Sequence, residues 1–190
     1  MNIQVLAGSL RTRSLSRAFA RCARARAAVL RAEGQSGLEL ELLSFAELPI
    51  YDADLDVDGG PESVRAFKAA IERADGLLVI TPEYNYSIPG GLKNALDWAS
   101  RPAYKSVLAH KGVATVGLSG NAVGGARAVG HLKQVLLGTL AEPYPQPDFL
   151  LAQAPTLFND EGELVDAGTN TRLDRMLLGF EAWLKRRALS

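Results

Sequence analysis

Short apolar runs alternate with amphipathic stretches along this chain. The apolar runs have the length of strands buried on both faces of a sheet, and they predict strands at residues 2–7, 77–80, 113–118 and 149–151. Between them, apolar residues recur every three or four positions, which is typical of helices with one buried face. The first of these helices would end near residue 31, and the others would span about 61–74, 89–100, 124–140 and 173–184. Such β-α alternation builds a parallel sheet covered by helices on both faces.

A different pattern marks the second predicted strand. Leu38, Leu40 and Leu42 alternate with Glu39 and Glu41, which is the period of a strand with one face in water. A half-exposed strand belongs at a sheet edge, and the strand order 2-1-3-4-5 places the second strand there. We therefore expect a flavodoxin-like α/β fold, a three-layer sandwich around a five-stranded parallel sheet in the order 2-1-3-4-5. In this order, ligands bind beyond the carboxyl ends of the first and third strands.

Length and composition bound the class of protein. The 190 residues contain no internal repeat, low-complexity tract or linker, so we expect one domain over residues 1–190. Acidic and basic residues balance at 21 each, which creates no overall field for a nucleic acid or a membrane surface. The single cysteine, Cys22, excludes an internal disulfide, and its place on an apolar helix stripe predicts a buried, unreactive thiol. Without a signal-like or long apolar segment, we expect a cytoplasmic protein.

Serines and an arginine follow the first predicted strand. A helix follows the segment Gly8-Ser9-Leu10-Arg11-Thr12-Arg13-Ser14-Leu15-Ser16, and the unpaired N–H groups at a helix N-terminus attract anions. The hydroxyl groups and the Arg11 guanidinium suit a phosphate, whereas we expect Arg13 on a solvated face. The segment is neither a G-x-G-x-x-G nor a Walker A sequence. From these residues alone, a phosphate-binding loop and a serine-rich helix cap are equally open.

The third predicted strand leads into a stiff aromatic loop. Its sequence is Thr81-Pro82-Glu83-Tyr84-Asn85-Tyr86-Ser87-Ile88-Pro89-Gly90-Gly91, followed by Leu92-Lys93-Asn94-Ala95-Leu96-Asp97-Trp98. Two prolines restrict the backbone, and two tyrosines with an asparagine offer flat apolar surface with polar tips. A flat heteroaromatic ligand fits such a loop.

The stretch from Pro82 to Trp98 resembles, almost residue for residue, the signature of the NADPH-dependent FMN reductase family of quinone, chromate and azo-dye reductases. The first loop is similar to that family's Gly-Ser-x-Arg-x-x-Ser phosphate motif, and the order of elements matches over roughly residues 3–140. The resemblance implies that the FMN phosphate is held by Ser9, Arg11, Ser14, Leu15 and Ser16. It also implies that the isoalloxazine ring is lined by Pro82, Glu83, Tyr84, Asn85 and Tyr86.

A third loop follows the fourth predicted strand. Its Ser119 and Gly120 resemble the family's serine-glycine pair, whose backbone approaches the flavin ring. Two positions depart from the family's usual pattern. Ser16 stands in place of asparagine, which would make one phosphate contact shorter or water-mediated. Asn121 stands in place of glycine, which would alter the wall around the ring.

The resemblance implies an enzyme that binds FMN and takes hydride from NADPH or NADH. Electrons would pass to a small acceptor, such as a quinone, free flavin, azo compound or chromate, by a ping-pong mechanism. Because the flavin carries the redox chemistry, we assign no catalytic acid or base. The family likeness also implies a homodimer or homotetramer. The alternative is a flavodoxin-like electron carrier without its own turnover, but such carriers are usually strongly acidic and this chain is neutral.

Other motifs weigh against hydrolase and metal chemistry. The segment 117–121 lacks the last glycine of a nucleophile elbow. Residues 54–59 imitate the start of an EF-hand loop, but Arg65 stands where the ligating glutamate belongs. His110 and His131 are isolated from cysteines and from each other, so they do not form a zinc-binding pattern. We therefore expect solvated histidines and no metal centre.

Overall fold

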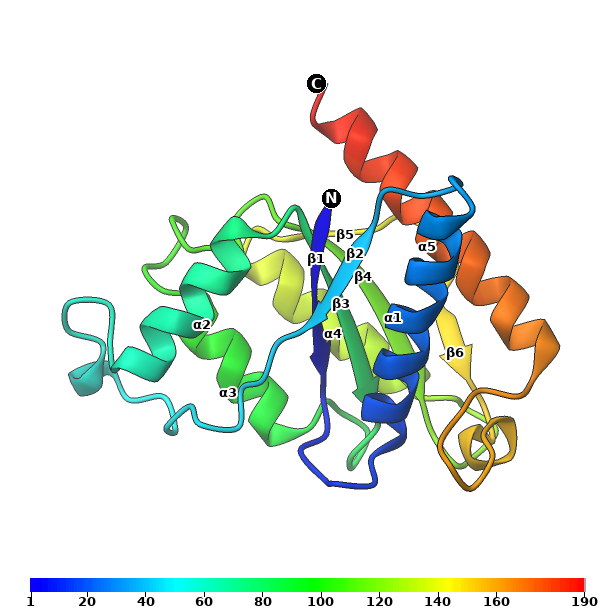
Figure 1. Cartoon of the computed structure of the whole chain (residues 1–190). Helices are drawn as coiled ribbons and strands as arrows, with labels where there is room; N and C mark the ends of the chain where they lie inside the picture. The colour runs from blue at the N-terminus through cyan, green and yellow to red at the C-terminus, as the bar shows by residue number, and fades with distance from the viewer. Residues whose placement is uncertain (190) are drawn as a thin grey trace.

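A parallel sheet lies between two layers of helices in the computed structural model, which describes residues 1–189 (Figure 1). The strands are β1 (Asn2–Ala7), β2 (Glu39–Leu42), β3 (Gly76–Pro82), β4 (Gly112–Leu118), β5 (Glu142–Pro143) and β6 (Phe149–Leu151). The helices are α1 (Leu15–Ala32), α2 (Glu62–Arg73), α3 (Gly90–Ala99), α4 (Ala126–Gly138) and α5 (Ala167–Arg187), with short 3-10 helices at Ala53–Leu55 and Ala154–Leu157. The order β2-β1-β3-β4-β5 confirms the predicted flavodoxin-like fold.

Each face of the sheet carries its own hydrophobic core. On one face, α1 and α5 bury Phe19 and Phe180 against the sheet. On the other, α2, α3 and α4 bury Ile71, Leu96 and Leu132. Burying one such side chain stabilises the fold by about 1.5–3 kcal/mol. The two cores therefore hold the strands, and with them the loops at the strand ends, in fixed positions.

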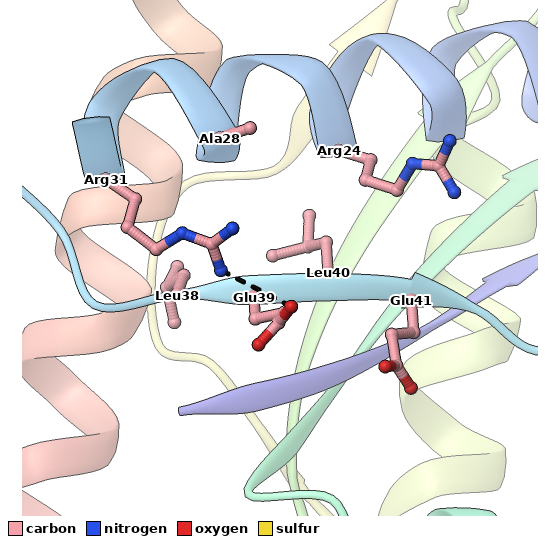
Figure 2. A pocket seen from close by; sticks show the side chains of 7 residues that line it. All are labelled: Arg24, Ala28, Arg31, Leu38, Glu39, Leu40 and Glu41. Atoms are coloured by element: carbon pink, nitrogen blue, oxygen red, sulfur yellow. Dashed lines mark ion pairs between the residues drawn. The ribbon is translucent and has the colours of Figure 1, made fainter.

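β2 forms one edge of the sheet, as its alternating sequence predicts. Leu40 is buried, whereas Glu39 and Glu41 are exposed. Between β2 and α1 lies a hollow of about 360 Å³, into which Arg24 and Arg31 extend from α1 (Figure 2). Arg31 forms an ion pair with Glu39 at 3.5 Å. Charged side chains along an edge strand oppose pairing with another chain, so the arginines and glutamates here protect the edge.

The opposite side of the sheet differs from the prediction. The sequence predicts one strand at residues 149–151, whereas two short segments, β5 and β6, pair in succession with β4. Pro143, Pro145 and Pro147 lie at the end of β5 and between the two segments. Proline has no N–H to donate to a ladder, which explains why this part of the chain forms two short strands rather than one.

The loops after β1, β3 and β4 all emerge at the carboxyl ends of the strands, at the bottom of the view in Figure 1. Gly8 shows how closely they approach, since its N–H donates to the Ile80 carbonyl at 2.7 Å. A Cβ on Gly8 would lie 3.1 Å from that oxygen and 3.2 Å from Pro82. Glycine therefore allows the loop after β1 to pass directly against the end of β3.

Candidate flavin site

A cavity of about 590 Å³ lies beyond these strand ends. Its lining comes from the loops after β1, β3 and β4 and consists of Ser9, Arg11, Arg13, Ser14, Leu15, Ser16, Pro82, Glu83, Tyr84, Leu118, Ser119, Gly120, Asn121 and Pro155. Among the residues assigned to FMN by resemblance, Asn85 and Tyr86 lie outside this lining, in the turn that follows Tyr84. The structure thus brings the other assigned residues together, and their contacts with FMN stay a prediction.

The cavity also includes residues that sequence analysis did not assign to it. Arg13 is exposed, as expected, but it lies in the loop before α1 and lines the cavity beside Arg11. Pro155 comes from the 3-10 helix Ala154–Leu157, far along the chain. The Ala154 N–H donates to the Ser119 carbonyl at 2.9 Å, which attaches this helix to the third loop. Such a long-range contact leaves no local pattern in the sequence.

The N-terminus of α1 lies at the end of the cavity where the sequence predicts the phosphate. Ser14 is its N-cap, and its Oγ accepts the Arg17 N–H at 3.4 Å. Ser16 is fully buried, and its Oγ accepts the Ser9 N–H at 3.3 Å while lying 2.7 Å from Ser14 Oγ. The Ser16 hydroxyl therefore closes the loop on itself. The first turn of α1 has no acidic side chain, so the partial positive charge of the helix end favours an anion here.

The loop after β3 makes a tight turn beside the cavity. Tyr84 and Ser87 exchange two backbone hydrogen bonds of 2.9 and 3.0 Å. Between them, Asn85 and Tyr86 have φ angles of 49° and 68°, the left-handed pair of a type I′ turn. The Tyr84 hydroxyl lies 3.0 Å from Ser9 Oγ. The loop that carries the tyrosines therefore contacts the phosphate loop directly.

Asn121 and Gly125 determine the conformation of the third loop. Asn121 Oδ1 accepts the Val123 N–H at 3.0 Å, and the Asn121 N–H donates to Ser119 Oγ at 3.0 Å. At Gly125, φ is 83°, and a Cβ would lie 2.7 Å from the Leu118 nitrogen. An asparagine side chain that bonds to the backbone two residues later stabilises a turn. The departure from the family's glycine at Asn121 therefore has a local structural role.

The residues around the cavity fit FMN. Helix N–H groups, serine hydroxyls and two arginines suit its phosphate, and Pro82, Tyr84 and Leu118 supply apolar wall for a flat ring. Glu83 adds a specific feature, because its Oε2 is buried without a hydrogen-bond partner among residues 1–189. Buried polar atoms normally have such a partner. A flavin carries an imide N–H and ribityl hydroxyl groups, which are donors of the required kind.

The other residues singled out in the sequence lie away from this cavity. His131 is on α4 with its Nδ1 3.0 Å from Ser87 Oγ, and exposed His110 is 3.5 Å from Glu142. Cys22 is half-buried rather than buried, and burial raises the pKa of its thiol, which agrees with an unreactive role. Within residues 1–189 we find no cluster of three metal-ligating side chains. Over the same range, no helix combines the length and apolarity needed to cross a membrane.

Fold and site together define a flavodoxin-like α/β protein with a cavity suited to a mononucleotide at the switch point between β1 and β3. More specifically, the chain belongs to the NADPH-dependent FMN reductase family, whose family model matches residues 1–156. This match confirms the resemblance seen in the first two loops. FMN is accordingly the cofactor of this enzyme, and a reduced nicotinamide nucleotide is its hydride donor.

Similar proteins cover nearly the whole chain. It is 37% identical to a 2-hydroxy-1,4-benzoquinone reductase of Burkholderia sp over 187 residues, 98% of each protein. It is 38% identical to an NADPH:quinone oxidoreductase of Arabidopsis thaliana over 189 residues, which cover 98% of this chain and 93% of that one. Among solved structures, the flavoenzyme NAD(P)H:(acceptor) oxidoreductase FerB of Paracoccus denitrificans matches with a TM-score of 0.85 and 34% identity over 97% of each chain.

Proposed function

We propose that this chain reduces quinones with electrons from NAD(P)H. The observation that carries the proposal is the cavity of about 590 Å³ that joins a phosphate loop to a wall containing Pro82, Tyr84 and Leu118. Tyr84 is 41% exposed at this wall, so part of the wall is open to solvent. Similar proteins from Burkholderia, Arabidopsis and Escherichia coli are named as quinone reductases, which favours a quinone over an azo compound, chromate or free flavin as the acceptor.

In this proposal, the chain binds and orients its ligands, and bound FMN supplies the hydride chemistry. The N-terminus of α1, with Arg11 and Arg13, holds the phosphate group. Pro82 and Leu118 exclude water from the apolar part of the wall. Glu83 offers its unpaired Oε2 as a hydrogen-bond acceptor. No side chain is given the role of a catalytic acid or base.

We infer a ping-pong order in which oxidised nicotinamide leaves before the quinone enters. Three loops, after β1, β3 and β4, line the cavity. The sequence contains no glycine-rich dinucleotide motif that would hold NAD(P)H elsewhere. Donor and acceptor would then use the same open side of the cavity in turn.

Anaerobic NADPH oxidation with 1,4-benzoquinone tests the function. The purified protein should consume NADPH steadily over many turnovers without any protein partner. An electron carrier would stop after its own flavin is reduced, and that result would overturn the proposal. The formal net charge of zero also favours the enzyme, because carriers of this fold dock to partners by opposite charge.

We also propose that residues 1–190 act as one unit that assembles into a homodimer or homotetramer in the cytoplasm, where NAD(P)H is available. Exposed apolar side chains support self-association. Ile50 and Val57 in the loop before α2 are 83% and 65% exposed, and Tyr86 is 65% exposed. Exposed apolar side chains can become buried in a contact between subunits.

A further inference from the structure

Arg127 lies outside the cavity but contacts the turn that forms part of its wall. It is the second residue of α4. Its Nε donates to Glu83 Oε1 at 2.6 Å, and its Nη2 lies 2.6 Å from the same oxygen. The Glu83 side chain is only 6% exposed, so this guanidinium compensates a buried negative charge. Because Arg127 occupies Oε1, the oxygen left without a protein partner is Oε2.

The same guanidinium covers Tyr86, whose backbone is unfavourable. The Arg127 guanidinium carbon lies 3.9 Å from the centre of the Tyr86 ring, a cation–π contact. Tyr86 has a φ of 68°, and this left-handed conformation is disfavoured for any residue with a Cβ and most for bulky ones. Asn85 tolerates such a φ better, because asparagine is common in left-handed turns. Arg127 thus contacts Tyr86, the residue of the turn whose backbone conformation is the least favourable.

From this turn, contacts continue to the phosphate loop. The Tyr84 hydroxyl lies 3.0 Å from the hydroxyl of Ser9, and the Ser9 N–H donates to the hydroxyl of Ser16 at the start of α1. Ser9 and Ser16 are both buried. A continuous series of contacts therefore runs from the N-terminus of α4, through residues 83–87, to the N-terminus of α1.

We propose that Arg127 is a positioning residue for the flavin site. By pairing with Glu83 and stacking on Tyr86, it holds residues 83–87 in their left-handed turn. The conformation of these residues then determines the shape of the cavity wall and the position of the Ser9 hydroxyl. Arg127 thereby controls how tightly FMN is held without lining the cavity.

The rate of FMN release from the holoenzyme tests this proposal. After dilution, released FMN is followed by its fluorescence, which is independent of any quinone activity. Arg127→Met keeps the apolar stem but loses the charge and the planar group. It should release FMN roughly five- to twentyfold faster, which is less than for a direct charge-assisted hydrogen bond to the ligand because Arg127 acts through the turn. Arg127→Lys keeps only the charge and should give an intermediate rate.

Arg26→Met is the matched control. Arg26 makes a comparable paired contact with Asp174, with bonds of 2.9 and 2.6 Å, between α1 and α5. Its loss should lower the melting temperature about as much as Arg127→Met does, with FMN release within about twofold of the wild type. If Arg127→Met releases FMN no faster than Arg26→Met, the proposal is wrong.

A double-mutant cycle separates positioning from general damage to the fold. Glycine adopts a left-handed backbone without cost, so Tyr86→Gly forms the turn unaided. In that background, Arg127→Met should accelerate FMN release by a clearly smaller factor than in the wild type, because only the pairing with Glu83 is then left to lose. An equal factor in both backgrounds would show that Arg127 does not act through Tyr86, and it would overturn the proposed role.

Discussion

At the scale of single residues, we expect positive charge at the proposed phosphate end of the cavity to decide how tightly the cofactor is held. Arg11 and Arg13 are both exposed and both line the cavity. Arg11 stands at the arginine position of the family's motif, so Arg11→Ala should weaken FMN binding about ten- to 150-fold, the equivalent of roughly 1.5–3 kcal/mol. Arg13→Ala should weaken it only about two- to fivefold, as expected for an exposed charge.

Riboflavin, which lacks the phosphate, makes this comparison specific. Titrations of the apoprotein should show that both variants bind riboflavin as the wild type does. Arg24→Ala provides a control, since Arg24 extends into the hollow beside β2 (Figure 2) and should leave both affinities unchanged. Equal losses for FMN and riboflavin would mean that these arginines do not hold the phosphate.

Local motifs were sufficient to predict most of the residues that line the cavity, but not the contacts between them. The loop sequences predict that Ser9, Glu83 and Ser119 lie close together, because the carboxyl ends of parallel strands are on the same side of the sheet. The pairing of Glu83 with Arg127 spans 44 positions and depends on how α4 packs against the loop after β3. No periodicity or motif encodes that geometry, so the role of Arg127 becomes visible only in three dimensions.

At the scale of elements, Glu181 fastens α5 to the segment between α1 and β2. Its carboxylate accepts hydrogen bonds from Ser36 Oγ at 2.6 Å and from the Gly37 N–H at 3.0 Å, and it pairs with Lys185. Burial acts to raise the pKa of Glu181, but the bonds from Lys185, Ser36 and Gly37 outweigh it, so the pKa lies below its ordinary value of 4.5. Folding therefore favours the ionised form.

A lowered pKa in the folded state means that this contribution is present above about pH 4.5 and is lost as the pH falls through the lowered value. Glu181→Gln should lower the melting temperature at pH 7 by several degrees, since such bonds are worth about 1.5–3 kcal/mol and each kcal/mol shifts a domain of this size by about 2–4 °C. The difference from the wild type should shrink below pH 4.5. Thermal melts from pH 7 to 3, with exposed Glu47→Gln as control, check this; a constant difference would contradict it.

Elements with strong periodicity were predictable, and those without it were not. β3 and β4 are buried along nearly their whole length, as their continuous apolar runs predict. β5 is only Glu142–Pro143, too short and too polar to show any period. It pairs with β4 because the chain after α4 is brought there by helix packing, which is a tertiary cause. The predicted strand order survives because β2 and the buried strands determine it.

At the scale of the whole molecule, we expect exposed apolar side chains to be covered by a second copy of this chain. Ile50, Val57 and Tyr86 would lie in water in a monomer. Light scattering at micromolar concentration should therefore give a particle of two or four chains of 20.3 kDa each. Ile50→Glu with Val57→Glu should shift the particle towards the monomer, because burying an unpaired charge at an interface is costly. A monomer for the unmodified protein would refute the assembly.

The order of substrates follows from the same architecture. If NAD(P)H and the quinone share the open side of one cavity of about 590 Å³, they cannot bind productively together, and initial-rate plots at several quinone concentrations should give parallel lines. Hydride transfer depends on close stacking rather than on proton abstraction. His110 and His131 lie outside the cavity lining, so flavin reduction measured by stopped flow should vary little from pH 6 to 8 in the wild type, His110→Ala and His131→Ala. Intersecting lines would instead require a separate nicotinamide site, and a steep bell-shaped profile would require an acid or base among the residues that line the cavity.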